Sequence, residues 1–390
     1  MTSISCSEIA RHLLARAIAG DVPAELPRAL LDDACSQALF GILAEGLADR
    51  FEPALCEVYA DLFAQAVPGA DPARYRRVRR PRAVAFEPRT VFVLSRVTLG
   101  ADIAVTSVLL DAAKQRFPQA QIVFVGPPKN YELFAADPRL AHAPVVYRRG
   151  TLQERLAVRH DLEALLAAPD ALIIDSDSRL TQLGLVPVCA EDRYRLFESR
   201  AYGGATEAAL PQLAAAWSEE TFGIAGAKSY IALAGEPTHR GTIAISLGVG
   251  DNPAKRLPNP FEENLLALLV ESGAEICIDK GAGGEEAARV ERAVARSGIR
   301  ATFWEGSFAG FAAIIAAARL YVGYDSAGQH AAAAAGVPLI SIFAGFPAPR
   351  MFHRWRPAGN VIRVDNPDPA EVIAHVRNCF RDVLPPKGPV

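Results

Sequence analysis

Hydrophobic and polar positions follow two different patterns along this chain. In the first 70 residues apolar side chains such as Ile9, Leu13 and Ile18 recur at helical spacing, which predicts amphipathic helices. From residue 89 onward, short apolar runs are separated by longer amphipathic stretches, which predicts buried strands that alternate with helices. The predicted strands span residues 89–95, 121–125, 171–175, 242–248, 275–279, 320–324 and 337–343.

Alternating strands and helices form parallel sheets with right-handed crossovers. The chain of 390 residues is too long for one ordinary core, and its strands fall into two groups. We therefore predict an α/β fold of two Rossmann-like domains facing across a cleft, with an N-terminal helical extension. The predicted boundaries give a helical extension and basic linker at 1–85, a first domain at 86–235 and a second domain at 236–390, joined by a linker at 235–241.

The extension has three candidate roles. It can cover a ligand cleft, contact a partner or add stability, and we favour added stability as the simplest of these.

The turn between the last two predicted strands is the strongest candidate for ligand binding. A helix N-terminus at the carboxyl end of a strand offers free N–H donors and the positive end of the helix dipole, which suit a diphosphate. Asp325 and Ser326 are typical helix-start residues, and Ala327 and Gly328 leave the backbone open to a ligand. His330 lies on the same helix face as Ser326. A simple helix cap is the competing interpretation.

Two further turns of the second domain carry features of phosphate binding. The Gly-rich loop 248–256 ends in Lys255 and Arg256, and glycine permits a close backbone approach while lysine supplies a point charge. The turn 280–284, which contains Gly281, follows the next predicted strand.

In the first domain, the loop after the first strand is the main candidate. Asp102 begins the following helix at the carboxyl end of that strand, where ligands of open α/β sheets bind, although a cap role is the alternative. Arg96, Thr98 and Gly100 belong to the same loop. Arg200 lies in a segment rich in Arg, Tyr and Glu at 193–204, which is either a polar ligand surface or a structural hairpin.

These turns resemble, in the same order, the signatures of glycosyltransferase family 9, the family of the ADP-heptose:lipopolysaccharide heptosyltransferases. The resemblance covers about residues 89 to 365 and rests on the loops 96–102 and 248–256 and on the stretch 325–333. The chain departs from the family at three points. It has Gly100-Ala101-Asp102 for the usual Gly-Asp pair, Leu257 for Trp and Ala327 for Gly.

The resemblance implies the GT-B arrangement and an inverting, metal-independent transfer of a sugar. The donor would be a nucleotide-diphosphate sugar, with ADP-heptose first, and the acceptor a saccharide or glycolipid of lipopolysaccharide or another cell-envelope glycan. No cofactor is implied. Asp102 would be the catalytic base. The donor would be held by Lys255, Arg256, Gly281, Asp325, Ser326, Ala327, Gly328 and His330, and the acceptor by Arg96, Thr98, Gly100 and Arg200.

Two other functions stay open. A sugar-nucleotide-binding protein without catalysis would fit the departures at Ala101 and Ala327. A GT-B-like epimerase would act on the same ligand without an acceptor.

The charge of the chain argues against one class of partner. The net charge of −3 gives no overall positive potential that would attract nucleic acid. A basic run at 74–82 is interpreted as a solvated linker, with attraction to an anionic acceptor or to inner-membrane lipids as the alternative.

Cysteine usage and hydropathy indicate a cytoplasmic protein, with the inner face of the cell membrane as a further candidate location. Six scattered cysteines predict free thiols in a reducing compartment. The N-terminus lacks a secretory pattern, and the longest small-residue stretch, 308–346, carries charges that favour a buried core over a membrane span.

Overall fold

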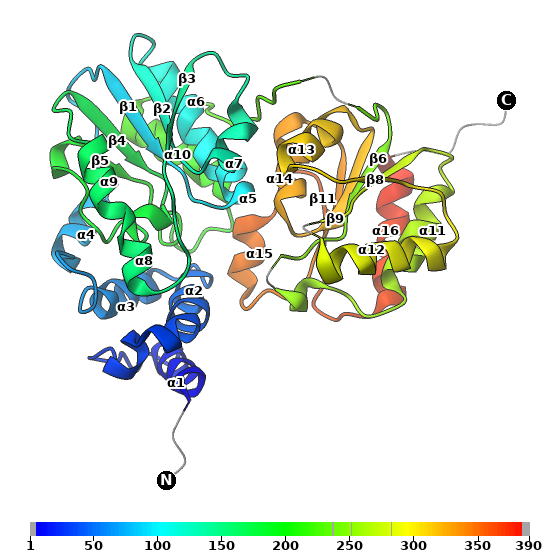
Figure 1. Cartoon of the computed structure of the whole chain (residues 1–390), viewed down its shortest axis with the longest axis horizontal. Coiled ribbons are helices and arrows are strands. Elements are labelled where there is room, and N and C mark those ends of the chain that lie inside the picture. The colour runs from blue at the N-terminus through cyan, green and yellow to red at the C-terminus, as the bar shows by residue number, and fades with distance from the viewer. Residues whose placement is uncertain (1–4, 236–237, 251, 282, 384–390) are drawn as a thin grey trace. The chain divides into compact units, whose positions relative to one another are not determined.

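The computed structural model describes residues 5–235, 238–250, 252–281 and 283–383 (Figure 1). The described residues form two compact units. The first comprises residues up to 131, 138–228 and 347–354, and the second comprises 132–137, 229–346 and the residues from 355 onward. The linker predicted at 235–241 includes residues 236 and 237, which lie outside the described residues. No helix in the described part of the chain is long and apolar enough to cross a bilayer.

The N-terminal extension is helical and belongs to the first unit (Figure 1). Its leucines, among them Leu13, Leu30 and Leu43, are buried in the same hydrophobic core as Leu94 and Ile173 of the sheet. The extension is therefore part of the first unit's own core. Its elements are α1 (Cys6–Ile18), 3₁₀ turns at Arg28–Leu31 and Asp33–Cys35, a π-helical segment at Ala38–Ala44, α2 (Glu45–Ala48), α3 (Pro53–Phe63) and α4 (Pro72–Val78).

The prediction that the basic run is a solvated linker is wrong. Most of the run forms helix α4, and Arg76 binds Glu57 at 2.5 Å and Asp61 at 2.7 Å on α3. Arg77 binds Glu191 at 2.7 Å in the sheet-containing part of the unit. Because acidic partners lie far away in the sequence, the local charge run gave no sign of them.

The first unit contains a parallel sheet of strand order β3-β2-β1-β4-β5. Its central strands are the predicted ones, because residues of β1, β2 and β4 are buried on both faces and read as apolar runs. The strands are β1 (Thr90–Leu94), β2 (Gln121–Gly126), β3 (Leu140–Pro144), β4 (Ala171–Asp175) and β5 (Tyr194–Leu196). The helices include α5 (Leu99–Ala101), a π-helical turn at Asp102–Thr106, α6 (Ser107–Arg116), α7 (Pro128–Tyr131), α8 (Leu152–Leu156), α9 (Val158–Leu165) and α10 (Leu210–Phe222).

The second unit contains a parallel sheet of strand order β11-β10-β9-β6-β7-β8. The strands are β6 (Ile243–Ser246), β7 (Ile276–Asp279), β8 (Thr302–Trp304), β9 (Leu320–Tyr324), β10 (Leu339–Phe343) and β11 (Asn360–Arg363). The helices are α11 (Phe261–Val270), α12 (Gly284–Ser297), α13 (Phe308–Ala317), α14 (Ala327–Ala335) and α16 (Pro369–Val383). The two sheets confirm the α/β two-domain fold class.

The C-terminal segments divide between the two units. The buried Val372, Val376 and Phe380 of α16 belong to the core of the second unit. Residues 347–354, most of α15 (Pro349–Trp355), group with the first unit. Arg354 is fully buried there, where its guanidinium donates to backbone carbonyls of Gly204, Thr206 and Ala208 at 2.7–3.0 Å.

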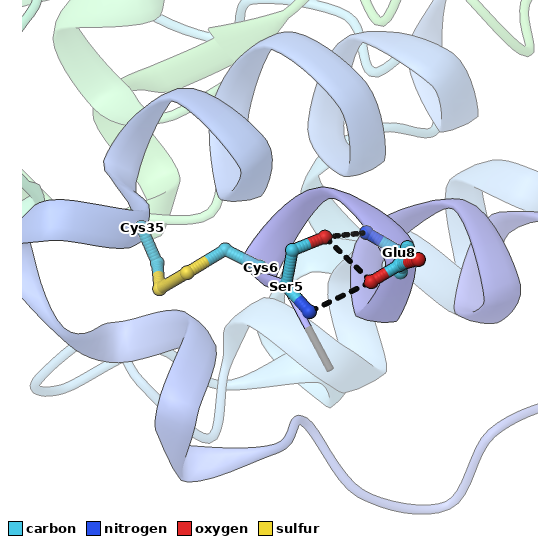
Figure 2. The surroundings of a disulfide bond; sticks show 4 residues. All are labelled: Ser5, Cys6, Glu8 and Cys35. Carbon is cyan, nitrogen blue, oxygen red and sulfur yellow. Dashed lines mark hydrogen bonds between the residues drawn. A yellow bond between two sulfur atoms is a disulfide. The ribbon is translucent and has the colours of Figure 1, made fainter. Parts of the chain in front are cut away.

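The prediction of free thiols is wrong for two of the cysteines. Figure 2 shows a disulfide between Cys6, the first residue of α1, and Cys35, with Cα atoms 5.5 Å apart. Beside it Ser5 and Glu8 form a capping box that starts α1, with Glu8 N–H donating to the Ser5 hydroxyl at 3.3 Å. The bridge ties the first helix to a turn 29 residues later. The other cysteines, Cys56, Cys189, Cys277 and Cys379, are free.

Reduction of the disulfide is expected to destabilise the first unit by about 3 kcal/mol, because a loop of this length loses less entropy on folding when it is closed. Unfolding midpoints with and without reductant measure the effect. The double variant Cys6→Ser/Cys35→Ser is the control and should not respond to reductant. A wild-type midpoint that does not move on reduction would contradict the expectation.

Candidate active site

A pocket of about 300 Å³ opens at the carboxyl edge of the second unit's sheet. The strand order reverses here, because β6 has β7 on one side and β9 on the other, and ligands of open α/β sheets bind at this position. Of the predicted donor residues, Gly281, Ser326 and Ala327 line the pocket. The other lining residues are Ser246, Gly248, Gly250, Asp279, Glu286, Gly306 and Phe308.

The N-terminus of α14 forms one wall of this pocket. The Ser326 side chain makes no capping hydrogen bond to the helix and lies 3.4 Å from the Tyr321 hydroxyl. The N–H groups of the first turn therefore have no side-chain cap and suit an anionic ligand. Gly328 serves a different purpose from the predicted one. A Cβ there would collide with the Tyr321 phenol, so this glycine makes room for an aromatic side chain.

Asp325 is a buried link between neighbouring turns, and it does not act as the helix cap. Its Oδ2 accepts from Lys255 Nζ at 2.6 Å, and its Oδ1 accepts from the Gln329 side chain. Gln329 Oε1 in turn accepts from the Ser341 hydroxyl on β10 at 2.5 Å. Lys255 also donates to the Asp325 carbonyl at 3.2 Å. An ammonium group has three N–H donors, so one donor of Lys255 remains for a ligand.

His330 and Arg256 do not line the pocket. Burial lowers the pKa of His330 to about 4, so its imidazole is neutral at physiological pH. The ring packs edge-on against Trp355 at 5.8 Å between centroids. His330 is therefore a packed side chain beneath the donor turn rather than a cation for a phosphate. The Arg256 Nε is buried and has no hydrogen-bond partner within the described residues.

Two carboxylates of the pocket were missed by the sequence interpretation. Asp279 ends β7, and burial raises its pKa while the Gly281 N–H donates to its Oδ1 at 3.1 Å. Glu286 lies in the first turn of α12. Added Cβ atoms at Gly248 and Gly281 would approach the Glu286 carboxyl to 2.5 and 2.7 Å, so both glycines keep that space open. An acidic residue after the second strand of a Rossmann half is a typical ribose ligand, and this rule would have found Asp279.

In the first unit, Asp102 is fully buried, and every hydrogen-bonding site of its carboxylate is occupied. Its Oδ1 accepts from Arg96 N–H at 2.7 Å and from the Thr106 hydroxyl at 2.6 Å. Its Oδ2 accepts from the Ser95 hydroxyl and from Asn130 Nδ2, each at 2.6 Å. Burial raises the pKa of Asp102, and these hydrogen bonds act in the opposite direction. The carboxylate thus joins the turns after β1 and β2.

The predicted acceptor residues Arg96 and Arg200 meet at Asp177, just beyond β4. Arg200 forms a bidentate pair with Asp177 at 2.8 and 3.0 Å, and both side chains are almost fully buried. Arg96 donates to Ser199 Oγ at 2.8 Å and lies 3.6 Å from Asp177. Thr98 precedes the short helix α5, which contains Gly100, and both residues are half-buried. The guanidinium groups of Arg96 and Arg200 therefore both form hydrogen bonds with residues of the first unit itself.

The N-terminal extension contributes to this same polar cluster. Tyr75 of α4 donates to Glu198 at 2.6 Å, and the Arg200 guanidinium lies 5.2 Å from the centre of the Tyr59 ring of α3. Burial raises the pKa of Glu198. The extension therefore covers part of the carboxyl edge of the first sheet with its own side chains.

Comparison with known proteins agrees with the architecture. Residues 192–375, just under half of the chain, match glycosyltransferase family 9 (heptosyltransferase). This span contains all the predicted donor residues, whereas Asp102 lies before it. A search of curated proteins finds no match.

Several solved structures share the fold. A glycosyltransferase family 9 protein from Veillonella parvula has 13% identity and a TM-score of 0.58, over 77% of this chain and 99% of that one. The E. coli heptosyltransferase WaaC with ADP has 18% identity and a TM-score of 0.57, over 75% and 99%. The E. coli ADP-heptose lps heptosyltransferase II has 17% identity and a TM-score of 0.52, over 75% and 99%. At these identities the likeness concerns the fold.

The family match contains two of the three signatures in the sequence, at 248–256 and 325–333, and the two-sheet fold is shared with the solved heptosyltransferases. Residues 192–375 of the chain are therefore similar to glycosyltransferase family 9 (heptosyltransferase).

Proposed function

We propose that the enzyme transfers a heptose from ADP-heptose to a saccharide or glycolipid acceptor of lipopolysaccharide or another cell-envelope glycan, with inversion and without a metal ion. The observation that carries the proposal is the pocket of the second unit, which combines an uncapped helix N-terminus with two carboxylates. A nucleoside diphosphate offers the matching groups, because its phosphates are anionic and its ribose carries hydroxyl donors.

Different residues of the pocket bind the diphosphate and the ribose. The N–H groups at the start of α14 and the remaining N–H of Lys255 hold the diphosphate. Asp279 and Glu286 accept hydrogen bonds from the ribose hydroxyls. WaaC has been solved with ADP and with ADP-2-deoxy-2-fluoro heptose, which supports ADP-heptose as the donor. We place the enzyme in the cytoplasm, with its acceptor presented at the inner face of the membrane. This placement rests on the proposed donor and acceptor and no longer on the cysteines, because Cys6 and Cys35 form a disulfide.

Lys255→Ala is expected to weaken ADP-heptose binding by about 1.5–3 kcal/mol, the range for a hydrogen bond to a charged group. Calorimetric titration measures the affinity. Thermal unfolding checks the fold, because Asp325 loses its cation in this variant. Lys228→Ala, at an exposed lysine of the first unit, is the control. An affinity equal to that of the wild type would remove Lys255 from the site.

Turnover is expected to persist in excess chelator. The leaving diphosphate receives its counter-charge from Lys255 and from the α14 dipole. In the described ranges, His, Cys, Asp and Glu side chains form no group of three that could hold a metal ion. Initial rates before and after chelation test this expectation, and a loss of turnover that magnesium or manganese restores would contradict it.

Asp102 is proposed as the base that takes the proton from the acceptor hydroxyl. That oxygen forms a bond to the anomeric carbon while the bond from this carbon to the diphosphate breaks, and the electron pair leaves with the nucleotide. The buried carboxylate sets a condition on this role, because its partners must give way when an acceptor binds. Catalytic hydrogen bonds often reach their working geometry only in the complex.

Asp102→Asn is expected to lower turnover by about 10²-fold or more and to leave donor affinity within a small factor, because only the proton acceptor is lost. The hydrogen-bond network around position 102 can accommodate asparagine. Asn130 can flip its amide and the Ser95 hydroxyl can rotate to accept from the new NH₂ group.

Steady-state rates and donor titrations of the folded variant test the role of Asp102. Asp161→Asn, at an exposed acid of α9, is the matched control. Transfer by Asp102→Asn at nearly the wild-type rate would show that Asp102 only joins the turns around it.

A further inference from the structure

A second pocket of about 330 Å³ lies at the same edge of the second unit's sheet, at the carboxyl ends of β10 and β11. The turn after β10 contributes Gly345 and Phe346, the turn after β11 contributes Asp365, and Ala254 supplies the wall nearest the donor loop. Apart from Ala254, which lies in the loop 248–256, these residues are outside the donor signatures described above.

Asp365 presents an anchored but unsaturated carboxylate to this pocket. Its Oδ1 accepts two hydrogen bonds from the Arg363 guanidinium, at 3.0 and 2.8 Å. Its Oδ2 accepts none from the residues that the structure describes, and the side chain is 64% exposed. An ionised carboxylate is an acceptor only, so the open oxygen suits hydroxyl donors of a ligand.

Phe346 supplies an aromatic surface to the same pocket. The Arg363 guanidinium lies 5.3 Å from the centre of its ring, and the Phe343 ring lies 5.9 Å from it. These contacts hold the ring in place. An aromatic face beside a fixed carboxylate offers both an apolar surface for C–H groups and an acceptor for hydroxyls, which is the combination a sugar ring requires.

The two pockets are joined by one loop. Gly250 lines the first pocket and Ala254 lines the second, and Lys255 follows at once. Gly345 packs so closely on Ala254 that a Cβ there would collide with the backbone of the loop. The turn after β9, which carries Asp325 and Ser326, lies between the pockets because β9 separates β10 from β6.

The spacing of the pockets matches a ligand with two parts. The midpoint of β10 and β11 lies two and a half strand spacings from β6, which is about 12 Å. A diphosphate with a sugar ring at each end covers such a span. The anionic middle of the ligand would then lie over the start of α14 and beside Lys255.

We propose that the second pocket binds the transferred sugar of the nucleotide-sugar donor, and that Asp365 and Phe346 determine which sugar is accepted. The proposal rests on the proposed function, because the nucleoside occupies the first pocket. Asp365 Oδ2 accepts hydrogen bonds from sugar hydroxyls, and one face of the sugar lies on the Phe346 ring.

Calorimetric titration of the full chain with ADP and with ADP-heptose separates the two pockets. Asp365→Ala is expected to weaken ADP-heptose binding about 10-fold to 100-fold and to leave ADP affinity unchanged, because ADP has no group in the second pocket. Glu286→Gln, in the first pocket, should weaken both ligands. Glu275→Ala, an exposed acid at the opposite edge of the same sheet, should weaken neither.

The outcomes distinguish this inference from the proposed function. If wild type binds both ligands and Asp365→Ala changes neither affinity, or lowers both equally, the second pocket is not the sugar site and the proposed function stands. If wild type binds neither ligand, the proposed donor is wrong and this inference falls with it. Because Asp365 is exposed, its loss should not prevent folding, which thermal unfolding checks.

Discussion

A buried carboxylate just beyond a central strand organises each unit of this protein. In the second unit, Asp325 follows β9 and joins Lys255 of the Gly-rich loop to Gln329 of α14. Removing one partner of a buried ion pair leaves an uncompensated charge and typically costs about 3–5 kcal/mol. The Lys255–Asp325 pair therefore holds the Gly-rich loop, the end of β9 and the start of α14 together beside the pocket proposed for the diphosphate.

Asp102 does the same in the first unit. It follows β1 and gathers donors from Ser95, Thr106 and Asn130. The two carboxylates differ in how closely a ligand could approach them. Asp325 lies next to residues that line a pocket, whereas Asp102 is fully buried among its hydrogen-bond partners. The proposed chemistry at Asp102 thus requires a rearrangement of its hydrogen-bond network, whereas the proposed donor pocket is already open.

The sequence predicted the interior of each sheet but not its borders. All of the predicted strands have neighbours on both sides, and β3, β5, β8 and β11, which were not predicted, are the edge strands. Interior parallel strands are covered on both faces and read as apolar runs, whereas an edge strand such as β8 is short and half-exposed. The burial of Asp102 was also beyond prediction, because Asn130 comes from a turn 28 residues away.

Long-range partners explain the remaining errors. The arginines of α4 are paired with acids such as Glu57 and Glu191, and Cys6 is bonded to Cys35, yet no local pattern marks either arrangement. The structure around Asp325 and Ser326 was predictable because a strand, a turn and a helix follow one another directly in the sequence. Glu286 was missed because it is a single acid without a distinctive neighbourhood, whereas the position of Asp279 at the end of β7 was a signal that could have been used.

We propose that the carboxyl edge of the second sheet holds the nucleoside diphosphate. Amide hydrogen exchange of the intact protein, with and without ADP, tests this proposal. We expect protection that is concentrated at 248–250, 279–281 and 325–330, the backbone segments around the pocket. Protection confined to the first unit, or no protection by ADP at saturating concentration, would contradict it.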